Sequence, residues 1–509
     1  MNKAKKFLVG LLAFASVSAF ALGLTACDSE QDKTGVQGEQ GVGIASVEVD
    51  ENGMLVITLT DGTVLPAIEI PTDEPIEKGS THYLQYQKIA NKEEYRLIGI
   101  GIAAESDIII SSTYNGLPVT EIAESAFEDI EHISSVTIPD SVTTIGVDAF
   151  YNCDNLTSVK IGSSVTAIGF RAFYNCSNLT SVTIPDSVTT IDAGAFCNCD
   201  NLTSVTIGNS VTTLGYAAFK DCDGLTSVTI PDSVTTLGYD AFKDCDGLTS
   251  VTIGNSVMGI GEESFYGCRN LTSVYYTGDI VGWCGISGLS AVMSKEVDLY
   301  INNEKVVDLV IPEDVERIND YAFAYCDSLT SVTLPDSVRT IGDNAFYGCP
   351  DELFTIYENV KYLGTANNPY YALIKTVTDT DRSYIIHKKT KVIANYAFAY
   401  CDDLTSITIP DLVTTIGNKA FAYCDNLTSV TLPDSVTAIG ECAFYRCRDL
   451  TSVVFEDTST WYRTYNYEDW ENKTNGILVD VDDATTMAEL LKEKRNDTVF
   501  DIGYYWYKL

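Results

Sequence analysis

Histidine is nearly absent from this sequence of 509 residues. Only His82, His132 and His387 occur, and they lie far apart along the chain. Histidine is the usual catalytic base near neutral pH and a frequent metal ligand, so its scarcity argues against a histidine-based active site or a multi-histidine metal centre. The chain also has no GxSxG, HExxH or P-loop motif. We predict no enzymatic activity, no catalytic residue, no metal site and no cofactor.

Basic residues are also scarce. The chain carries 32 Lys and Arg against 71 Asp and Glu, which gives a formal net charge of −39. Nucleic-acid affinity rests mainly on basic side chains that displace counterions from phosphates, so we predict that nucleic acid is not a partner. Hydrophobic residues nonetheless make up 45% of the chain. That level exceeds the range in which a charged chain stays disordered, and it predicts a large folded core.

The amino terminus has the pattern of an exported protein. Three lysines precede an apolar run over residues 7–24, and the run ends in Leu24-Thr25-Ala26-Cys27 before a polar stretch. This pattern predicts a signal peptide over residues 1–26. A transmembrane helix is the alternative, but the run is at the short limit for one and contains small residues throughout.

Leu24-Thr25-Ala26-Cys27 resembles the lipobox of bacterial lipoproteins. The resemblance implies that the chain is cut before Cys27, that the thiol is linked to diacylglycerol, and that the new amine is acylated, with palmitate among the expected lipids. Two or three acyl chains give stable attachment to a bilayer. We therefore expect a lipid-anchored protein of the bacterial cell envelope, on the outer face of the cell membrane or on the cell surface.

An acidic segment and a small sheet follow the expected anchor. Residues 27–43 contain acids and glycines and predict an extended, solvated tether. Residues 44–80 contain three stretches of apolar and β-branched residues, separated by Asn-Gly at 52–53 and Asp-Gly at 61–62. These dipeptides are typical of hairpin turns, so this segment predicts a small β-meander and a linker.

Residues 81–455 contain a regular repeat. Phenylalanine recurs every 23 residues, and the interval is lengthened at two places, near residues 277–310 and 351–390. Equal periods predict stacked coils, that is, a solenoid. The repeat phenylalanines are Phe127, Phe150, Phe173, Phe196, Phe219, Phe242, Phe265, Phe323, Phe346, Phe398, Phe421 and Phe444.

One unit of the repeat, residues 179–201, reads LTSVTIPDSVTTIDAGAFCNCDN. Its first apolar alternation predicts a short strand that Pro185 ends. Val188 and Ile191 begin the return, and residues 195–199 suit a short helical or 3₁₀ turn. About eight apolar side chains per coil should point inward. We expect an elongated right-handed solenoid with a parallel sheet along one wall.

The pattern LxxVxIPxSVxxIGxxAFxxC covers about residues 110–455 and is similar to the leucine-rich repeats of BspA-like bacterial surface proteins. The resemblance implies an α/β leucine-rich-repeat solenoid and, for some members, binding to extracellular host proteins or to other bacteria. It transfers no ligand residue, because the shared motif is the structural frame. The leading hypothesis is a non-enzymatic adhesion solenoid for host, matrix or neighbouring-cell proteins. A glycan-capture or structural envelope lipoprotein is the alternative, and a hydrolase is less favoured.

Two features are candidates for the binding surface, whose partner would be an extracellular protein or glycan. Serine and threonine recur along the predicted sheet as a regular array of uncharged hydroxyls, although such residues also simply suit an exposed strand. The insertions carry aromatic residues, which interfaces favour but which could also fold back on their own coil. The candidate residues are Ser181, Thr183, Ser204, Thr206, Ser227, Thr229, Trp283, Tyr370 and Tyr371.

The repeat ends after Val454. Residues 456–509 are rich in tyrosine and tryptophan, and they predict a helix over residues 484–495. We expect an aromatic C-terminal cap, because the last coil would otherwise expose its core. Carbohydrate stacking on these rings is the alternative.

Aspartates recur in two columns. In one column they occupy alternate coils, and we interpret the alternation as spacing of like charges. In the other, Asp200, Asp223 and Asp246 occupy consecutive coils, for which Asx-turn capping is the simpler explanation and calcium binding the alternative. The alternating column consists of Asp140, Asp186 and Asp232.

Eleven cysteines form a further column, each three residues after a repeat phenylalanine. Free buried thiols are the favoured interpretation. Disulfides between adjacent coils are the alternative, since an exported location permits them. Metal binding is disfavoured, because Cys197 and Cys199 are the only close pair in the repeats. The column consists of Cys153, Cys176, Cys199, Cys222, Cys245, Cys268, Cys326, Cys349, Cys401, Cys424 and Cys447.

The thiols can be counted directly. Denatured mature protein treated with a thiol label and no reductant is expected to show nearly fourteen reactive thiols, that is, the 15 cysteines of the chain less the lipidated Cys27. A count near zero would show that the column is disulfide-bonded.

Overall fold

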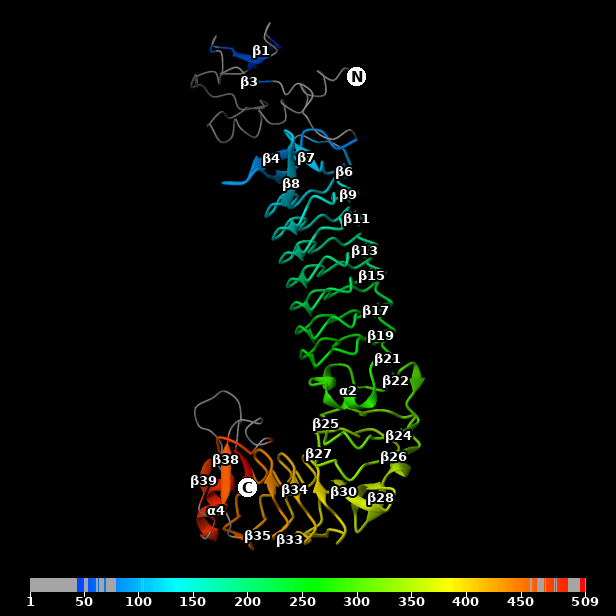
Figure 1. Cartoon of the computed structure of the whole chain (residues 1–509), viewed down its shortest axis with the longest axis vertical. Helices are drawn as coiled ribbons and strands as arrows, with labels where there is room; N and C mark the ends of the chain where they lie inside the picture. The colour runs from blue at the N-terminus through cyan, green and yellow to red at the C-terminus, as the bar shows by residue number, and fades with distance from the viewer. Residues whose placement is uncertain are drawn as a thin grey trace, which may run out of the picture.

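The computed structural model shows an elongated stack of coils (Figure 1). The coils up to about residue 276 stack along one axis. The stack then bends, and the coils after residue 368 stack along an axis at a large angle to the first. The predicted signal peptide, Cys27 and the tether lie outside the described residues. The structure describes residues 44–49, 54–60, 63, 68–69, 79–101, 103, 105–293, 295–457, 460–464, 471, 473–479, 481, 483–492 and 504–508.

The Ser-x-Thr strand of each coil belongs to a first parallel wall. Neighbouring strands are in register, so that Ser181 lies beside Ser204 and Thr183 beside Thr206. The first sheet of this wall consists of β6 (Asp107–Ile109), β9 (Ser135–Thr137), β11 (Ser158–Lys160), β13 (Ser181–Thr183) and β15 (Ser204–Thr206). The second sheet consists of β17 (Ser227–Thr229), β19 (Ser250–Ile253), β21 (Ser273–Tyr276), β22 (Asp298–Ile301) and β23 (Glu304–Lys305). The later sheets are β24 (Asp308–Val310) with β26 (Ser331–Thr333), and β31 (Ser383–Ile385), β33 (Ser406–Thr408), β35 (Ser429–Leu432) and β37 (Ser452–Phe455).

A second strand in each coil forms a second wall, where we predicted a sheet on one wall only. Most of these strands have two residues, a length at which alternation cannot be recognised in sequence. The first sheet runs β4 (Gln85–Lys88), β5 (Tyr95–Gly99), β8 (Leu117–Ile122), β10 (Thr144–Ile145), β12 (Ala167–Ile168), β14 (Thr190–Ile191), β16 (Thr213–Leu214), β18 (Thr236–Leu237) and β20 (Gly259–Ile260), with β7 (Thr113–Tyr114) beside β8. After it come β25 (Arg317–Ile318) with β27 (Thr340–Ile341), and then β32 (Val392–Ile393), β34 (Thr415–Ile416) and β36 (Ala438–Ile439).

The third side of each coil is a turn around the repeat phenylalanine, where we predicted a helical or 3₁₀ turn. In the coil of Phe196, Gly194 and Asn198 have positive φ angles of 62° and 58°. The N–H of Phe196 donates to the carbonyl of Ala218 in the next coil at 2.8 Å. A helix would satisfy its amides within the coil. Here only the alternate amides of Gly194, Phe196 and Asn198 donate to the next coil, and the amides of Ala195 and Cys197 close tight turns within their own coil. The left-handed residues at 194 and 198 produce this alternation, which a helix cannot have.

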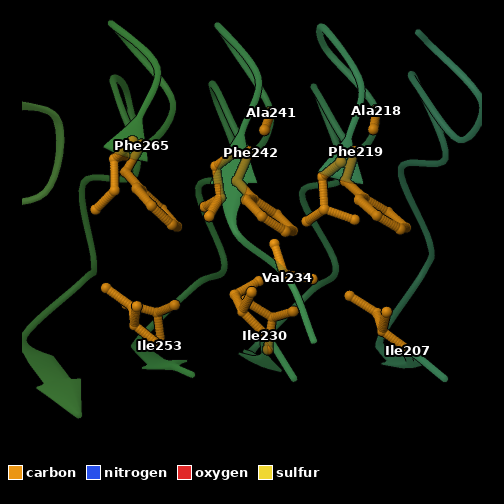
Figure 2. Packing of buried hydrophobic residues seen from close by; sticks show 14 of the residues in the cluster. Ile207, Ala218, Phe219, Ile230, Val234, Ala241, Phe242, Ile253 and Phe265 are labelled. Carbon is orange, nitrogen blue, oxygen red and sulfur yellow. The ribbon is translucent and has the colours of Figure 1, made fainter. Parts of the chain in front are cut away.

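The core is a column of stacked phenylalanine rings facing aliphatic side chains (Figure 2). From Phe127 to Phe265 successive ring centroids lie 4.9 to 5.4 Å apart. The predicted inward side chains of one coil are all buried, and they are Leu179, Val182, Ile184, Val188, Ile191, Ala195, Phe196 and Cys199. Each coil therefore buries its apolar residues by covering the open face of its neighbour.

The cysteine column is buried beside the phenylalanines, as predicted. The Sγ of Cys176 donates to the carbonyl of Phe150 at 3.2 Å, and the Sγ of Cys199 donates to that of Phe173 at 3.3 Å. Burial raises the pKa of the Cys153 thiol to about 12. In nine of the eleven coils the thiol donates to the carbonyl of the preceding repeat phenylalanine. Cys401 instead lies beside the hydroxyls of Thr376 and Tyr384.

The alternation of Pro-Asp coils with Gly coils has a geometric reason beyond charge spacing. The Asp186 carboxylate accepts the backbone N–H of Asn209 in the next coil at 2.8 Å. A Cβ at Gly208 would lie 2.4 Å from the carbonyl oxygen of Pro185. Glycine is needed there because the two backbones approach closely enough for the aspartate to cap the next coil.

The two insertions form distinct structures. The first contains α2 (Ile280–Gly285) and the 3₁₀ helix η1 (Leu289–Ala291). The second contains the 3₁₀ helix η2 (Asp351–Leu353) and the antiparallel strands β28 (Thr355–Tyr357), β29 (Val360–Thr365) and β30 (Asn368–Thr376). β30 also pairs in parallel with β32, so the second insertion becomes part of the second wall.

Both ends of the chain have the predicted elements. β1 (Ile44–Val49), β2 (Met54–Leu59) and β3 (Ile68–Glu69) form an antiparallel meander. At the other end, β40 (Tyr505–Lys508) pairs with β36 and with β38 (Trp461–Thr464), and β39 (Ile477–Val479) follows β38. The helix α4 (Ala484–Lys492) lies against β37. No helix in the described ranges has the length and apolar character needed to cross a membrane.

The glycine contact between coils makes a stability prediction. Gly208→Ala should lower the thermal unfolding midpoint, because the new methyl group displaces either the Pro185 carbonyl or the Asp186 cap. Gly285→Ala is the matched control, since a Cβ at Gly285 meets nothing within 4 Å. Thermal melts followed by circular dichroism measure both variants. Equal midpoints for the two would contradict the close-contact interpretation.

Candidate binding surface

The six candidate hydroxyl residues on the first wall lie on one exposed face. The outer residues of β13, β15 and β17 are exposed, and the central valines of β13 and β17 are buried. The register places serine beside serine and threonine beside threonine from β13 to β15. The ladder is interrupted between β15 and β17. The predicted hydroxyl array is therefore a continuous two-row surface over two coils, and the third coil extends it across a break in the sheet.

Two classes of hydroxyl occur on this wall. The first class, just before each strand, is structural, since Thr180 Oγ1 donates to the Thr157 carbonyl at 3.1 Å and Thr203 Oγ1 to the Thr180 carbonyl at 3.0 Å. The second class consists of the six candidate residues. None of their hydroxyls has a hydrogen-bond partner within the described part of the chain. We call these six residues the hydroxyl wall, and each hydroxyl is available to donate and to accept.

The aromatic candidates of the insertions are mostly internal, which corrects the prediction that they form a surface. Trp283 is fully buried, and its Nε1 donates to the Ala322 carbonyl at 2.6 Å. Tyr371 is also buried, and its hydroxyl donates to the Asp336 carbonyl at 2.8 Å. Tyr370 is half-buried and stacks on His387 with ring centroids 3.7 Å apart. These rings fill the insertions because the inserted segments have no repeat neighbour to cover them.

A column of exposed apolar side chains is a feature that sequence reasoning missed. Val147, Phe170, Tyr216 and Tyr239 occupy the same position of their coils, and the two tyrosines are 58% and 57% exposed. Ala193 fills this position in the intervening coil. The signal was present in the sequence, because the second residue after the second-wall Ile or Leu is apolar in five successive coils.

A cavity of about 490 Å³ lies where the second insertion meets the coils. Residues of the turn around Phe346, of β30 and of the turn before Phe398 line it, among them Asp343 and Lys375. Burial, with a smaller contribution from the charge of Asp320, raises the pKa of the Asp343 carboxyl to about 6. The cavity thus combines the carboxyl groups of Asp343 and Asp351 with two lysines, Lys361 and Lys375, and with tyrosine rings.

The stacked aspartates show no metal site. Burial, followed by the charges of Asp223 and Asp221, raises the pKa of Asp200. In the described ranges no cluster of three or more His, Cys, Asp or Glu residues could hold a metal ion.

The repeat pattern also matches a family profile. The profile is described as the BspA type leucine rich repeat region, and it matches residues 107–226, 215–281, 298–378 and 382–478 in 6 copies. These residues make up more than half of the chain. This chain belongs to the BspA-type leucine-rich repeat family. In this chain the two walls and the phenylalanine turn are the form that the repeat takes.

Solved structures similar to this BspA-type chain come from several bacteria. A leucine rich cell surface protein from Faecalibacterium prausnitzii A2-165 is 26% identical, with coverage of 80% of this chain and 98% of its own and a TM-score of 0.36. A leucine-rich repeat protein from Bacteroides ovatus is 22% identical, with coverage of 74% and 94% and a TM-score of 0.34. The Leucine Rich Repeat protein of T. pallidum is 23% identical, with coverage of 50% and 91% and a TM-score of 0.32. No curated protein matches the sequence.

The half-buried Asp343 carboxyl predicts a pH-dependent change in stability. Its folded pKa of about 6 exceeds the ordinary value of 3.8, so the folded state binds the proton more tightly. Its contribution to stability is therefore lost as pH rises through about 6. Asp343→Asn should raise the thermal midpoint at pH 7.5, and the gain should shrink at pH 4.5. The exposed Asp314→Asn is the control, and a gain for Asp343→Asn that is equal at both pH values would contradict the assignment.

Proposed function

We propose that this protein is a non-enzymatic binding lipoprotein of the bacterial cell envelope, whose hydroxyl wall contacts an extracellular macromolecule. The observation that carries the proposal is the difference between the two hydroxyl classes. Thr180 and its equivalents bond to the neighbouring coil, whereas the hydroxyls of the wall have no partner in the described ranges. Solvent-facing groups that a fold does not need are the ones free to bind a ligand.

The ligand class follows from the wall's shape and chemistry. Rows of weak, uncharged donors and acceptors repeat about every 4.8 Å along the stack. Such an array favours an extended partner that makes many small contacts over a compact ligand that needs one deep site. We therefore propose host, matrix or neighbouring-cell proteins as partners, with adhesion as the role.

The amino terminus supports the proposed location. The lipobox-like Leu24-Thr25-Ala26-Cys27 would attach the mature chain to the membrane, and the acidic segment after it would hold the solenoid away from the bilayer. The formal charge of −39 is consistent with this arrangement, because it repels an anionic lipid surface.

Glycan capture is the second candidate function. The exposed rings of Phe170, Tyr216 and Tyr239 favour it, because aromatic faces stack on the apolar faces of sugar rings. These rings lie at a different position of the coil from the hydroxyl wall, so variants of the two surfaces separate the two functions.

A binding array tests the proposal. Mature chain carrying Cys27→Ser is screened against matrix proteins and glycans, and the affinity of each hit is then measured for two triple variants. Thr183→Lys, Thr206→Lys and Thr229→Lys place bulk and charge on the hydroxyl wall and should weaken a protein hit at least about tenfold, which is about 1.4 kcal/mol. Thr190→Lys, Thr213→Lys and Thr236→Lys alter exposed threonines on the second wall and should leave it unchanged.

Two results would contradict the proposal. One is the absence of any protein or glycan hit, and the other is a hit that both triple variants weaken equally. A glycan hit that Tyr216→Ala and Tyr239→Ala abolish would support the second candidate function instead.

A further inference from the structure

The turns around the repeat phenylalanines are joined by backbone hydrogen bonds, and this row of bonds is interrupted at the second insertion. The N–H of Phe323 donates to the carbonyl of Ala345 in the next coil at 2.8 Å. The equivalent donor in that next coil is the N–H of Phe346, which has no acceptor among the described residues. The row resumes at Phe398, whose N–H donates to the carbonyl of Ala420 at 2.7 Å.

A cavity lies at the interruption. The chain leaves the coil of Phe346 into η2, β28 and β29 and returns in β30, and this circuit contains no Ala-Phe turn. The cavity of about 490 Å³ is lined by residues of three segments, at 341–349, 374–377 and 394–396, and by four residues between 351 and 361 or in the preceding coil. We call it the insertion cavity. Because the equivalent N–H groups point to the next coil, that of Phe346 points toward this cavity.

The charges that line the insertion cavity are balanced. Its charged residues are the two carboxyl groups of Asp343 and Asp351 and the two ammonium groups of Lys361 and Lys375. Lys361 is paired with Asp351 at 2.6 Å, and the charge of Lys375 acts on the Asp343 carboxyl. The formal charges of the four groups cancel at neutral pH. An anionic or cationic ligand would therefore meet a lining charge of its own sign as well as one of the opposite sign.

Aromatic rings give the same cavity an apolar side. They belong to Tyr325, Tyr347, Phe354 and Tyr396. Tyr347 is 47% exposed, and its ring meets that of Tyr325 edge-on with centroids 5.3 Å apart. The Lys375 ammonium lies 6.0 Å from the centroid of the Tyr347 ring. Ring surface and hydrogen-bonding groups are thus adjacent in one cavity.

This combination fits a neutral saccharide. A sugar ring carries apolar C–H faces, which stack on aromatic rings, and hydroxyls, each of which donates and accepts. The Asp343 carboxylate can accept from a hydroxyl, and the N–H of Phe346 can donate to one. A purely apolar ligand would leave these groups unsatisfied at a cost in affinity. The volume of about 490 Å³ also falls within the range of small-molecule sites, which is about 300–1,000 Å³.

We propose that the insertion cavity binds a neutral sugar, either free or as the terminal unit of a glycan, with Tyr347 stacked on the sugar ring and Asp343 and the N–H of Phe346 bonded to its hydroxyls. The site is separate from the hydroxyl wall and from the exposed rings of Tyr216 and Tyr239. It does not rest on the proposed contact with extracellular proteins, so either function can fail without the other.

A glycan array followed by calorimetry tests the proposal. The mature chain carrying Cys27→Ser is applied to neutral, sialylated and sulfated glycans, and the terminal sugar of each neutral hit is then titrated alone. Neutral glycans should bind and charged ones should not, and the bound sugar should slow hydrogen exchange of amides in residues 343–349. A free sugar that binds as tightly as its glycan assigns the cavity to soluble sugars, and a tighter glycan assigns it to glycan ends.

Variants of the ring test its role. Tyr347→Ala should weaken binding at least about tenfold, and Tyr347→Phe should retain it, because stacking needs the ring and not the hydroxyl. Tyr266→Ala is the matched control and should bind as the parent does. Tyr266 holds the same position of its coil, is 63% exposed and has the Lys243 ammonium 5.5 Å from its ring centroid, but it does not line the cavity. Thermal melts check that all three variants are folded.

Four outcomes would overturn the proposal. They are the absence of any neutral glycan or sugar that binds, binding confined to charged glycans, protection from exchange outside residues 343–349 alone, and equal loss of binding in Tyr347→Ala and Tyr266→Ala. Sugar binding that the triple lysine variant of the hydroxyl wall abolishes and Tyr347→Ala leaves intact would also overturn it, because it would place the sugar on the wall.

Discussion

The hydrogen bonds between successive coils are the interaction on which the rest of this structure depends. They hold equivalent residues of neighbouring coils about one strand spacing apart, as the ring centroids from Phe127 to Phe265 show at 4.9 to 5.4 Å. At that distance each side chain meets its own equivalent. Each column therefore consists of residues that can pack against an identical residue one coil away. Phenylalanine rings stack, thiols donate to backbone carbonyls, and glycine occurs where two backbones are in contact.

The same spacing decides where charge can be placed. Carboxylates in adjacent coils would repel, and the structure avoids this at Asp186 by pairing it with the N–H of Asn209 and by alternating aspartate with an uncharged residue. Hydroxyls carry no such cost, so serine and threonine can repeat in every coil. An uncharged wall on a chain of net charge −39 is thus a consequence of stacking, and it gives a partner a surface free of the repulsion that the rest of the molecule exerts.

The repeat period was enough to predict the coils, because the buried positions of one unit recur in all of them. It did not predict the second wall, whose strands are two residues long, or the phenylalanine turn, whose shape depends on positive φ at residues as different as Gly194 and Tyr400. The hydroxyl wall followed from the same period. Trp283 and Tyr371 were wrongly expected on the surface, because burial of an insertion is decided by tertiary packing that no local pattern encodes.

A repeat can make a binding site in two physically different ways, with a regular wall or with an interruption. A regular wall offers many equal, weak contacts, so its specificity must come from the length of the partner. An interrupted repeat instead offers a few unequal contacts at one place in the stack. Where one turn is left out, the donors of Phe346 and its neighbours keep the geometry imposed by the stack while losing their acceptors. Specificity can then arise at an insertion without any change to the coils on either side.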